Sequence, residues 1–351
     1  MPTIVDTQNA DLREILQDKL PVLTFDDPVF TDIMPISSCM TEMVMWEQRD
    51  NYVGLLSPRE YDGGFGRVAR EGINRWAVLP GKYGDQKQIK EAELASSRQM
   101  GSFGDVWDVR KIQAGDQDHL LTRAIVRLKK IAWDLVINAV YSVPDLTGKV
   151  LATDTFNTQT FTAAIAWSNL ATATPLADIR AMKLKARGSS VRFDKSAKIY
   201  LNATTINYML MNTNTTDLGG KRTMNAGGQI QPLGLDTLNQ ILLDNNLPIV
   251  VEYDGTYQDE AGTITLYIPD NKGVLIGARE NGEPVAEFFM TPNPNNLAPG
   301  GQGYVPGFSE GMQNLYYDFE WKKNPIRGIS TLGLNGAPAV YYGSAVVRLN
   351  L

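Results

Sequence analysis

The chain has 351 residues, of which 43% are hydrophobic and 21% charged, and its net charge is −6. Such values are typical of a folded protein and disfavour a protein whose whole surface grips nucleic acid. Cys39, the one cysteine, cannot form an internal disulfide, and no apolar run approaches the ~18 residues that span a bilayer. The acidic start lacks the features of a signal peptide, so we expect a protein made in the cytoplasm, without a membrane partner.

The first sixty residues form an acidic stretch that is interrupted by prolines. They contain eleven Asp and Glu residues against four Lys and Arg residues. One short helix is expected over residues 9–19, and an extended arm after it. An arm cannot bury its own large apolar side chains, among them Phe25, Phe30 and, further on, Trp46. We therefore expect these side chains to dock on another surface.

A basic stretch rich in glycine follows. Residues 67–90 hold six Lys and Arg residues against two acidic ones, and NRWAVLP is their clearest strand. We expect a glycine-hinged hairpin of about thirty residues, a length that is usually functional in a loop. The opposite charges of arm and loop suggest surfaces for neighbouring copies of the chain, because complementary charge steers such contacts and fixes their register.

The strongest element is a helix predicted over residues 116–142. Its apolar residues recur at the 4-3-4-3-4 spacing of one helical face, namely Leu121, Ile125, Leu128, Ala132, Leu135 and Ala139. Asp116 or Asp118 is expected to cap it, and Pro144 to end it. At 1.5 Å per residue such a helix is roughly 40 Å long. We expect it to serve as a spine for other elements.

The second half of the chain alternates between short strands and helices. Helices are predicted from Thr174-Pro175, from the cap Asn202 through Met211, and over residues 235–243. SAKIYLN is predicted as a strand, and LPIVVEYDGTYQDEAGTITLYIPDNKGVLI (residues 247–276) as a three-stranded meander. Beyond Ala278 the sequence predicts mostly loops, before AVVRLNL returns as a strand to an earlier sheet.

Equipment for catalysis is scarce in this sequence. With His119 as its one histidine and one cysteine, the chain cannot assemble a His/Cys metal site. Residues 64–69 match G-x-G-x-x-A but lack the flanking strand and helix of a dinucleotide site, and the acids in DGTYQDEAGT suit a turn. We therefore predict no catalytic, cofactor-binding or metal-binding residues. An enzyme that uses His119 remains an alternative.

The densest basic stretch lies between residues 179 and 198. Arg180, Lys183 and Arg187 are predicted to share one helix face, opposite Ile179 and Met182. A solvated face explains this pattern, and a sequence-independent contact with phosphates is the sharper alternative. No aromatic residues interleave with the basic ones, so base recognition is not indicated.

The order of elements resembles that of the major capsid proteins of tailed bacteriophages, in particular the lambda-type major head protein family. The stretches that carry the resemblance are NAVYSVPDLTGKV, KIYLNATTINYMLMN and the predicted meander, with its motif residues Tyr253, Asp254, Gly255 and Tyr257. The family implies an α+β, HK97-like fold. By this resemblance the chain divides into an N-terminal arm (1–57), an extended E-loop (58–102), a P-domain with the spine helix (103–215), an A-domain (216–330) and a C-terminal strand returning to the P-domain (331–351).

The resemblance implies a shell protein of the virion that assembles with itself, as hexamers and pentamers, into an icosahedral capsid around double-stranded DNA. We expect contacts between subunits through two sets of residues: Phe25, Phe30 and Trp46 of the arm, and Arg67, Arg70, Arg75 and Trp76 of the E-loop. The basic face with Arg180, Lys183 and Arg187 would face the lumen and hold the DNA without sequence preference.

Further partners follow from the same resemblance. Only about a dozen helix-prone residues precede the arm, so a separate scaffolding protein is expected, along with a portal protein at one vertex and room for a decoration protein. Assembly is expected in the host cytoplasm. An encapsulin-like nanocompartment shell is the main alternative, and a decoration or tail-tube protein is a weaker one.

Overall fold

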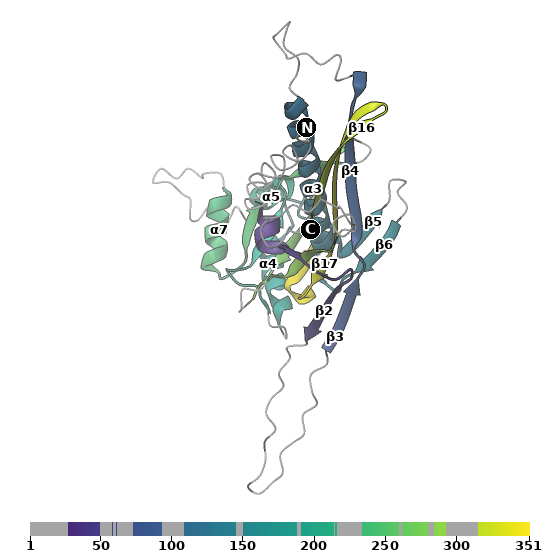
Figure 1. The fold of residues 1–351 in the computed structure, drawn as a ribbon. Helices are drawn as coiled ribbons and strands as arrows, with labels where there is room; N and C mark the ends of the chain where they lie inside the picture. The colour runs from purple at the N-terminus through teal and green to yellow at the C-terminus, as the bar shows by residue number, and fades with distance from the viewer. Residues whose placement is uncertain are drawn as a thin grey trace.

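A computed structural model describes residues 27–49, 58, 61, 73–92, 109–144, 150–187, 191–213, 215, 234–259, 262–279, 284–292 and 315–351. Within these residues, a long helix lies beside two five-stranded sheets (Figure 1). The helix and sheets bring together stretches that are far apart in the sequence.

The spine helix α3 spans Val109–Asn138, about 45 Å at 1.5 Å per residue. All six residues of the predicted apolar face are buried. The predicted bounds were wrong at both ends. Asp116 lies inside the helix, and the chain leaves it at Ala139 (φ 56°), well before Pro144. The residues that follow, VYSVP, contain β-branched and aromatic side chains and form strand β5 instead.

The first sheet packs one face on α3. Its order is β1-β15-β17-β16, and β4 pairs with β17 on the other side. The strands are β1 (Ile36–Ser38), β4 (Gly81–Lys90), β15 (Ala286–Met290), β16 (Tyr316–Lys323) and β17 (Ile326–Val340). The prediction of loops beyond Ala278 was therefore wrong. The central strand β17 contains glycines and Pro338, residues that usually indicate the end of a strand. Nevertheless, only one of eleven consecutive residues from Gly328 is not buried.

The second sheet has the order β10-β9-β13-β18-β7. Its strands are β7 (Gln159–Thr162), β9 (Lys198–Leu201), β10 (Ile249–Glu252), β13 (Lys272–Ile276) and β18 (Val346–Asn350). The prediction of a meander over residues 247–276 was wrong. Strands β10 and β13 do not pair with each other through a strand of this stretch, because β9 lies between them. The predicted return strand β18 joins β13 and β7, one from each side of the predicted boundary at residues 215–216. Backbone hydrogen bonds thus unite the two stretches predicted as separate domains.

Short ladders and helices complete the described structure. The ladders are β2 (Val44–Arg49) with β3 (Ile73–Val78), β5 (Val140–Pro144) with β6 (Val150–Thr155), β8 (Val191–Arg192) with β14 (Ala278–Arg279), and β11 (Thr256–Gln258) with β12 (Ile264–Leu266). The helices are α4 (Pro175–Lys183), α5 (Ala203–Met211) and α7 (Leu235–Asp244), with short turns η1 (Val29–Ile33), η2 (Leu184–Ala186) and η3 (Gly343–Ala345). Asn202 caps α5 as predicted, its side chain accepting the Thr205 N–H at 2.9 Å.

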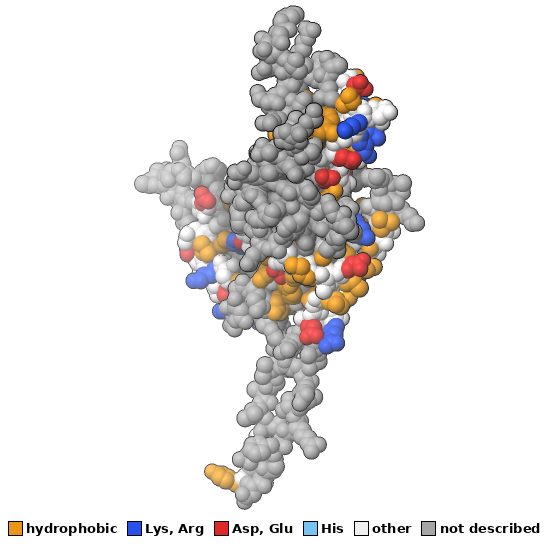
Figure 2. Space-filling view, viewed as in Figure 1, with side chains coloured by type: hydrophobic (Ala, Val, Ile, Leu, Met, Phe, Trp, Pro, Cys, Tyr) orange, Lys and Arg blue, Asp and Glu red, His pale blue; other side chains and the backbone are white. Residues whose placement is uncertain are grey.

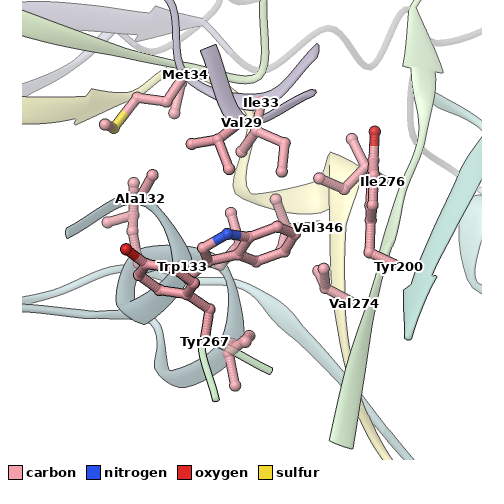
Figure 3. Packing of buried hydrophobic residues seen from close by; sticks show 14 of the residues in the cluster. Val29, Ile33, Met34, Ala132, Trp133, Tyr200, Tyr267, Val274, Ile276 and Val346 are labelled. Carbon is pink, nitrogen blue, oxygen red and sulfur yellow. The ribbon is translucent and has the colours of Figure 1, made fainter. Parts of the chain in front are cut away.

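The core lies where α3, η1 and the second sheet meet. Trp133 of α3 is 1% exposed and is surrounded by Val29, Ile33, Tyr200 and Val274 (Figure 3). Its ring lies 5.7 Å from that of Tyr200, in an edge-to-face arrangement. A segment of the predicted arm therefore belongs to the hydrophobic core of its own chain.

Candidate functional site

Two regions concentrate the residues singled out by the sequence. We call the first the arm junction, made by residues 27–34, α3 and residues 253–259 and 262–267. The second is the hairpin base, made by residues 39–49 and 73–79, which include β2 and β3. The first lies inside the molecule and the second on its surface.

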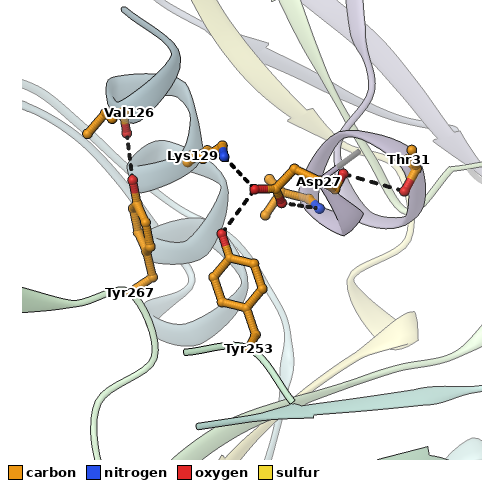
Figure 4. A network of polar contacts seen from close by, with 7 residues as sticks. Asp27, Thr31, Val126, Lys129, Tyr253 and Tyr267 are labelled. Atoms are coloured by element: carbon orange, nitrogen blue, oxygen red, sulfur yellow. Dashed lines mark hydrogen bonds and ion pairs between the residues drawn. The ribbon is translucent and has the colours of Figure 1, made fainter. Parts of the chain in front are cut away.

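Asp27 holds the start of the arm junction. Its carboxylate accepts the Val29 N–H at 3.0 Å and lies 2.5 Å from the Lys129 ammonium of α3. The Tyr253 hydroxyl donates to the same carboxylate at 3.3 Å (Figure 4). Both charged side chains are mostly buried, with 22% of Lys129 and 12% of Asp27 exposed. One carboxylate therefore joins the arm, the spine helix and the turn after β10.

Asp32 makes a second ionic contact one helical turn later. It lies 2.5 Å from the Lys198 ammonium and accepts a hydrogen bond from the Tyr200 hydroxyl at 2.8 Å, and both partners belong to β9. Burial alone would raise the pKa of Asp32. The hydrogen bonds from Lys198 and Tyr200, with the positive charge of Lys198, outweigh burial and hold this pKa below its ordinary value.

The motif residues predicted for the A-domain pack against α3. The ring of Tyr253 lies 4.6 Å from that of Trp133, and the Lys130 ammonium lies 5.2 Å above the ring of Tyr257. Gly255 leaves room for this packing, because a Cβ there would come within 2.9 Å of the Tyr253 ring. Asp254 is exposed. Three of the four motif residues therefore stabilise the subunit itself.

The hairpin base joins β2 and β3 in antiparallel register, with Trp46 opposite Trp76. Trp46 is buried within the chain, where its indole N–H donates to the Val340 carbonyl at 3.0 Å and its ring stacks on Phe156. Trp76, by contrast, is 41% exposed. On the opposite face of the ladder, Glu47 and Arg75 form an exposed ion pair at 2.9 Å.

Several large apolar side chains are exposed around this ladder. Met45 lies on the ladder face of Glu47 and Arg75, with Met43 two residues before it in the chain, and Trp76 lies on the other face. Leu79 and Met40 lie beside the ladder, and Met40 is the most exposed of the five at 81%. In Figure 2, hydrophobic side chains lie on the surface beside a red and blue pair, where Figure 1 places β2 and β3. A cluster of exposed apolar residues is the usual mark of an interaction surface. The sequence pattern did not reveal it, because Met43 and Met45 alternate with the equally apolar Val44 and Trp46, so the sequence does not show which face of the strand is exposed.

The residues predicted to contact other subunits thus divide into three groups. Phe30 and Trp46 are buried in their own chain, so they leave little area for a neighbour. Arg75 pairs within the chain and Trp76 remains partly exposed. Phe25, Arg67 and Arg70 lie outside the described residues.

The predicted basic face is only partly a helix face. Arg180 and Lys183 belong to α4, opposite the buried Ile179 and Met182, as expected. Arg187, however, follows η2 in extended backbone, so it does not continue the helix. The Lys183 ammonium donates to the Asn246 carbonyl at 2.7 Å. The part of the chain that the structure describes contains no group of three or more His, Cys, Asp or Glu side chains arranged to hold a metal.

No helix in the described ranges is both long and apolar enough to cross a membrane.

Comparison with solved structures finds the same fold in capsid proteins. A phage-related protein from Bordetella bronchiseptica RB50 superposes with a TM-score of 0.56 at 10% identity, over 97% of this chain and 96% of that one. The asymmetric unit of the cyanophage A-1(L) capsid gives 0.52 at 14% identity, over 96% and 92%. A putative prophage capsid protein of E. coli CFT073 gives 0.50 at 12% identity, over 95% and 98%. The chain therefore has the HK97-like capsid fold.

Comparison of the sequence itself gives the family. No curated protein matches the chain. The family model described as phage major capsid protein E matches residues 25–304, which is most of the sequence and includes the arm junction, the hairpin base and the spine helix. The chain belongs to the phage major capsid protein E family.

Proposed function

We propose that the chain assembles with copies of itself, as hexamers and pentamers, into the icosahedral shell of a phage virion that encloses double-stranded DNA. The exposed apolar cluster at the hairpin base is the observation that carries the proposal. Large apolar side chains lose water favourably when a partner covers them, at about 25 cal/mol per Å². Other large apolar side chains are also exposed, among them Ile264 and Met211, but at the hairpin base several lie close together in the sequence and along one ladder, so a neighbour could cover them at once.

The arm junction is buried in the subunit and the hairpin base is exposed at its surface, and this difference supports a structural rather than a catalytic role. The arm junction fixes residues 27–34 in the core, and the ladder β2–β3 continues from that fixed point through the intervening residues. The hairpin base is therefore presented from a rigid body. Each contact in a closed symmetric shell is repeated many times, so a modest apolar contact suffices.

Electron microscopy of the purified recombinant chain tests this proposal directly. We expect closed shells or capsomer rings, alone or after co-expression with a scaffolding protein from the same genome. A species that stays monomeric under every condition would contradict the proposal. The contents of the shells then distinguish a capsid, which encloses DNA, from a nanocompartment, which encloses a protein cargo.

A variant of the hairpin base sharpens the test. Replacing Met40, Met43 and Met45 together by serine removes exposed apolar surface, so we expect a folded subunit that no longer forms shells. Met211→Ser is the matched control, since Met211 is 64% exposed and lies on α5, away from the hairpin. Shells that form equally well from both variants would exclude the hairpin base as the contact.

Further partners belong to this proposal. A separate scaffolding protein, a portal protein at one vertex and a decoration protein are the partners that a shell of this family would use, and assembly would take place in the host cytoplasm. The lumenal role of Arg180, Lys183 and Arg187 is a proposal of the same kind. Charge reversal at Arg180, which is exposed, tests it through the DNA content of the particles.

A further inference from the structure

The methionines of the described residues are either fully buried or exposed. The buried ones belong to the core and are at most 1% exposed: Met34, Met182, Met209 and Met290. Three of the exposed ones stand within six residues of sequence at the hairpin base, namely Met40 at 81%, Met43 at 39% and Met45 at 67%. The other is Met211 of α5, at 64%. The hairpin base therefore gathers most of the exposed methionines in the part of the chain that the structure describes.

Strand β2 holds Met45 in its outward position. On the other face of the strand, Val44 and Trp46 are 1% and 7% exposed, and the Trp46 indole N–H donates to the Val340 carbonyl at 3.0 Å. Because side chains alternate along a strand, burial of Met45 would require a shift of one residue, which would bring Val44 and Trp46 into water. The register with β3, in which Met45 is opposite Ala77, opposes such a shift. Met45 therefore stays exposed until another molecule covers it.

An exposed thioether is open to oxidation by two electrons. Hydrogen peroxide transfers one oxygen to the sulfur: an S–O bond forms, the O–O bond of the peroxide breaks, and the second oxygen leaves as water with both protons. The sulfur is oxidised and the peroxide is reduced. The product, methionine sulfoxide, is polar where the thioether was apolar, and this change disrupts methionine-rich interfaces. The core methionines are shielded, because the oxidant must reach the sulfur.

Sulfoxides at the hairpin base would alter the surface on which the proposed function depends. A neighbour that covers Met45 would have to remove water from the sulfoxide oxygen, and an apolar partner surface offers that oxygen no hydrogen-bond donor. Met40 and Met43 precede Met45 on the same short segment, so the same contact would bear all three penalties. Oxidation of this segment therefore opposes the burial that drives the contact.

We propose that Met40, Met43 and Met45 form an oxidation site that controls the entry of a free subunit into the shell. An oxidant of the peroxide class converts them to sulfoxides and withdraws the subunit from assembly. The inference rests on the proposed self-assembly through the hairpin base and adds a covalent modification to it. In the finished shell, the neighbour that covers the hairpin base also shields the three sulfurs. Oxidation thus acts on the free subunit and spares the assembled particle.

Substitution by leucine separates the sulfur from the apolar surface. The triple variant Met40→Leu with Met43→Leu and Met45→Leu keeps similar side-chain volumes but cannot form sulfoxides. Unassembled wild type and variant are treated with hydrogen peroxide, quenched with free methionine and then set to assemble, as followed by light scattering and electron microscopy. Treatment should raise the wild-type subunit concentration at half-assembly by at least about tenfold, and that of the triple variant by less than about twofold. Met211→Leu is the matched control and should remain as sensitive as wild type.

Peptide mass spectrometry of the same samples locates the added oxygen. In wild type, loss of assembly should follow the sulfoxide content of residues 40, 43 and 45 across a series of peroxide doses. Methionine sulfoxide reductases should restore assembly, since they remove the oxygen as water while two thiols form a disulfide. This series tests the proposal even where the triple variant fails to assemble before treatment. Loss of assembly that follows another residue instead would contradict the proposal.

The remaining outcomes are distinct. A triple variant that loses assembly as readily as wild type would place the sensitive group elsewhere, Cys39 included, and overturn the proposal. Wild type that carries the three sulfoxides and still forms normal shells would also overturn it, as would shells whose three methionines oxidise as fast as those of free subunits. Untreated wild type that never forms shells would overturn the proposed function together with this inference. Shells that form without treatment and are unaffected by prior oxidation would overturn the inference alone.

Discussion

The arm junction and the hairpin base include neighbouring stretches of the chain, residues 27–34 and residues 39–49, yet these stretches use apolar residues in opposite ways. Val29, Ile33 and Met34 are fully buried by α3 and the second sheet. Met40 and Met45, only a few residues later, are largely exposed. The difference shows where the subunit ends and its assembly surface begins. A deletion of the arm up to Pro35 would remove core residues, so it tests the stability of the subunit before it tests assembly.

The largest contrast is expected between two tryptophans. Trp133→Ala should lower the free energy of unfolding by about 3–5 kcal/mol, because it empties a fully packed site between Tyr200 and Tyr253. Trp76→Ala, at a 41% exposed position, should lower it by less than about 1 kcal/mol. Urea unfolding of the unassembled subunit measures both. Equal losses would mean that the hairpin base is part of the core.

The two ion pairs provide the next contrast. Asp27→Asn should cost about 2–3 kcal/mol, since it leaves the mostly buried Lys129 ammonium without its carboxylate. Glu47→Gln breaks the exposed pair with Arg75, where the expected cost is at most about 0.5 kcal/mol. The same urea titration compares them. A large cost for Glu47→Gln would show that the ladder β2–β3 depends on its outer face.

A smaller effect is expected from pH. The pKa of Asp32 is lower in the folded subunit than in the unfolded chain, so its contribution to stability is complete above the ordinary value near 3.8 and is lost as pH falls through the folded-state pKa. Asp32→Asn should therefore destabilise the subunit at neutral pH and flatten the decline in stability below pH ~4. Thermal unfolding followed from pH 7 to pH 3 gives both slopes. If the stability of variant and wild type declined in parallel with falling pH, the Asp32 carboxylate would be excluded as a source of the pH dependence.

The smallest effect on the subunit is expected from Met45→Ser. Met45 is 67% exposed, so the free energy of unfolding should change by less than about 0.5 kcal/mol. Shell yield should nevertheless fall, and this separation of stability from assembly is what the comparison predicts. Sedimentation of assembled particles, set beside urea unfolding of the same preparation, measures it.

Elements with a regular local pattern were predictable from the sequence. The apolar face of α3, the proline at the start of α4 and the Asn202 cap of α5 each depend on residues within a few positions. The family and its HK97-like fold were also predicted correctly. The long strand β17 was not, because its glycines face other strands closely: a Cβ at Gly336 would meet the Phe289 carbonyl oxygen at 2.6 Å. That need arises only in the assembled sheet.

The candidate sites were harder to predict for the same reason. Asp27 and Asp32 looked like ordinary charges of an acidic arm, and their partners Lys129 and Lys198 are more than a hundred residues away. The pairing of β4 with β17 likewise depends on a strand register that joins residues 90 and 327. Local patterns cannot show such contacts, since they exist only after distant strands have paired.

The order of strands in the second sheet has a consequence for biosynthesis. Strands β7 and β18 are direct neighbours, and the side chains of Thr162 and Asn350 meet across 188 residues of sequence. Until the ribosome has made β18, β7 lacks its neighbour, and β13, once it has been made, has one side open. Pairing of such distant strands is slow and leaves edges open to other chains. A nascent subunit is thus unable to complete this sheet early, and demand for chaperones should be highest during that interval of translation.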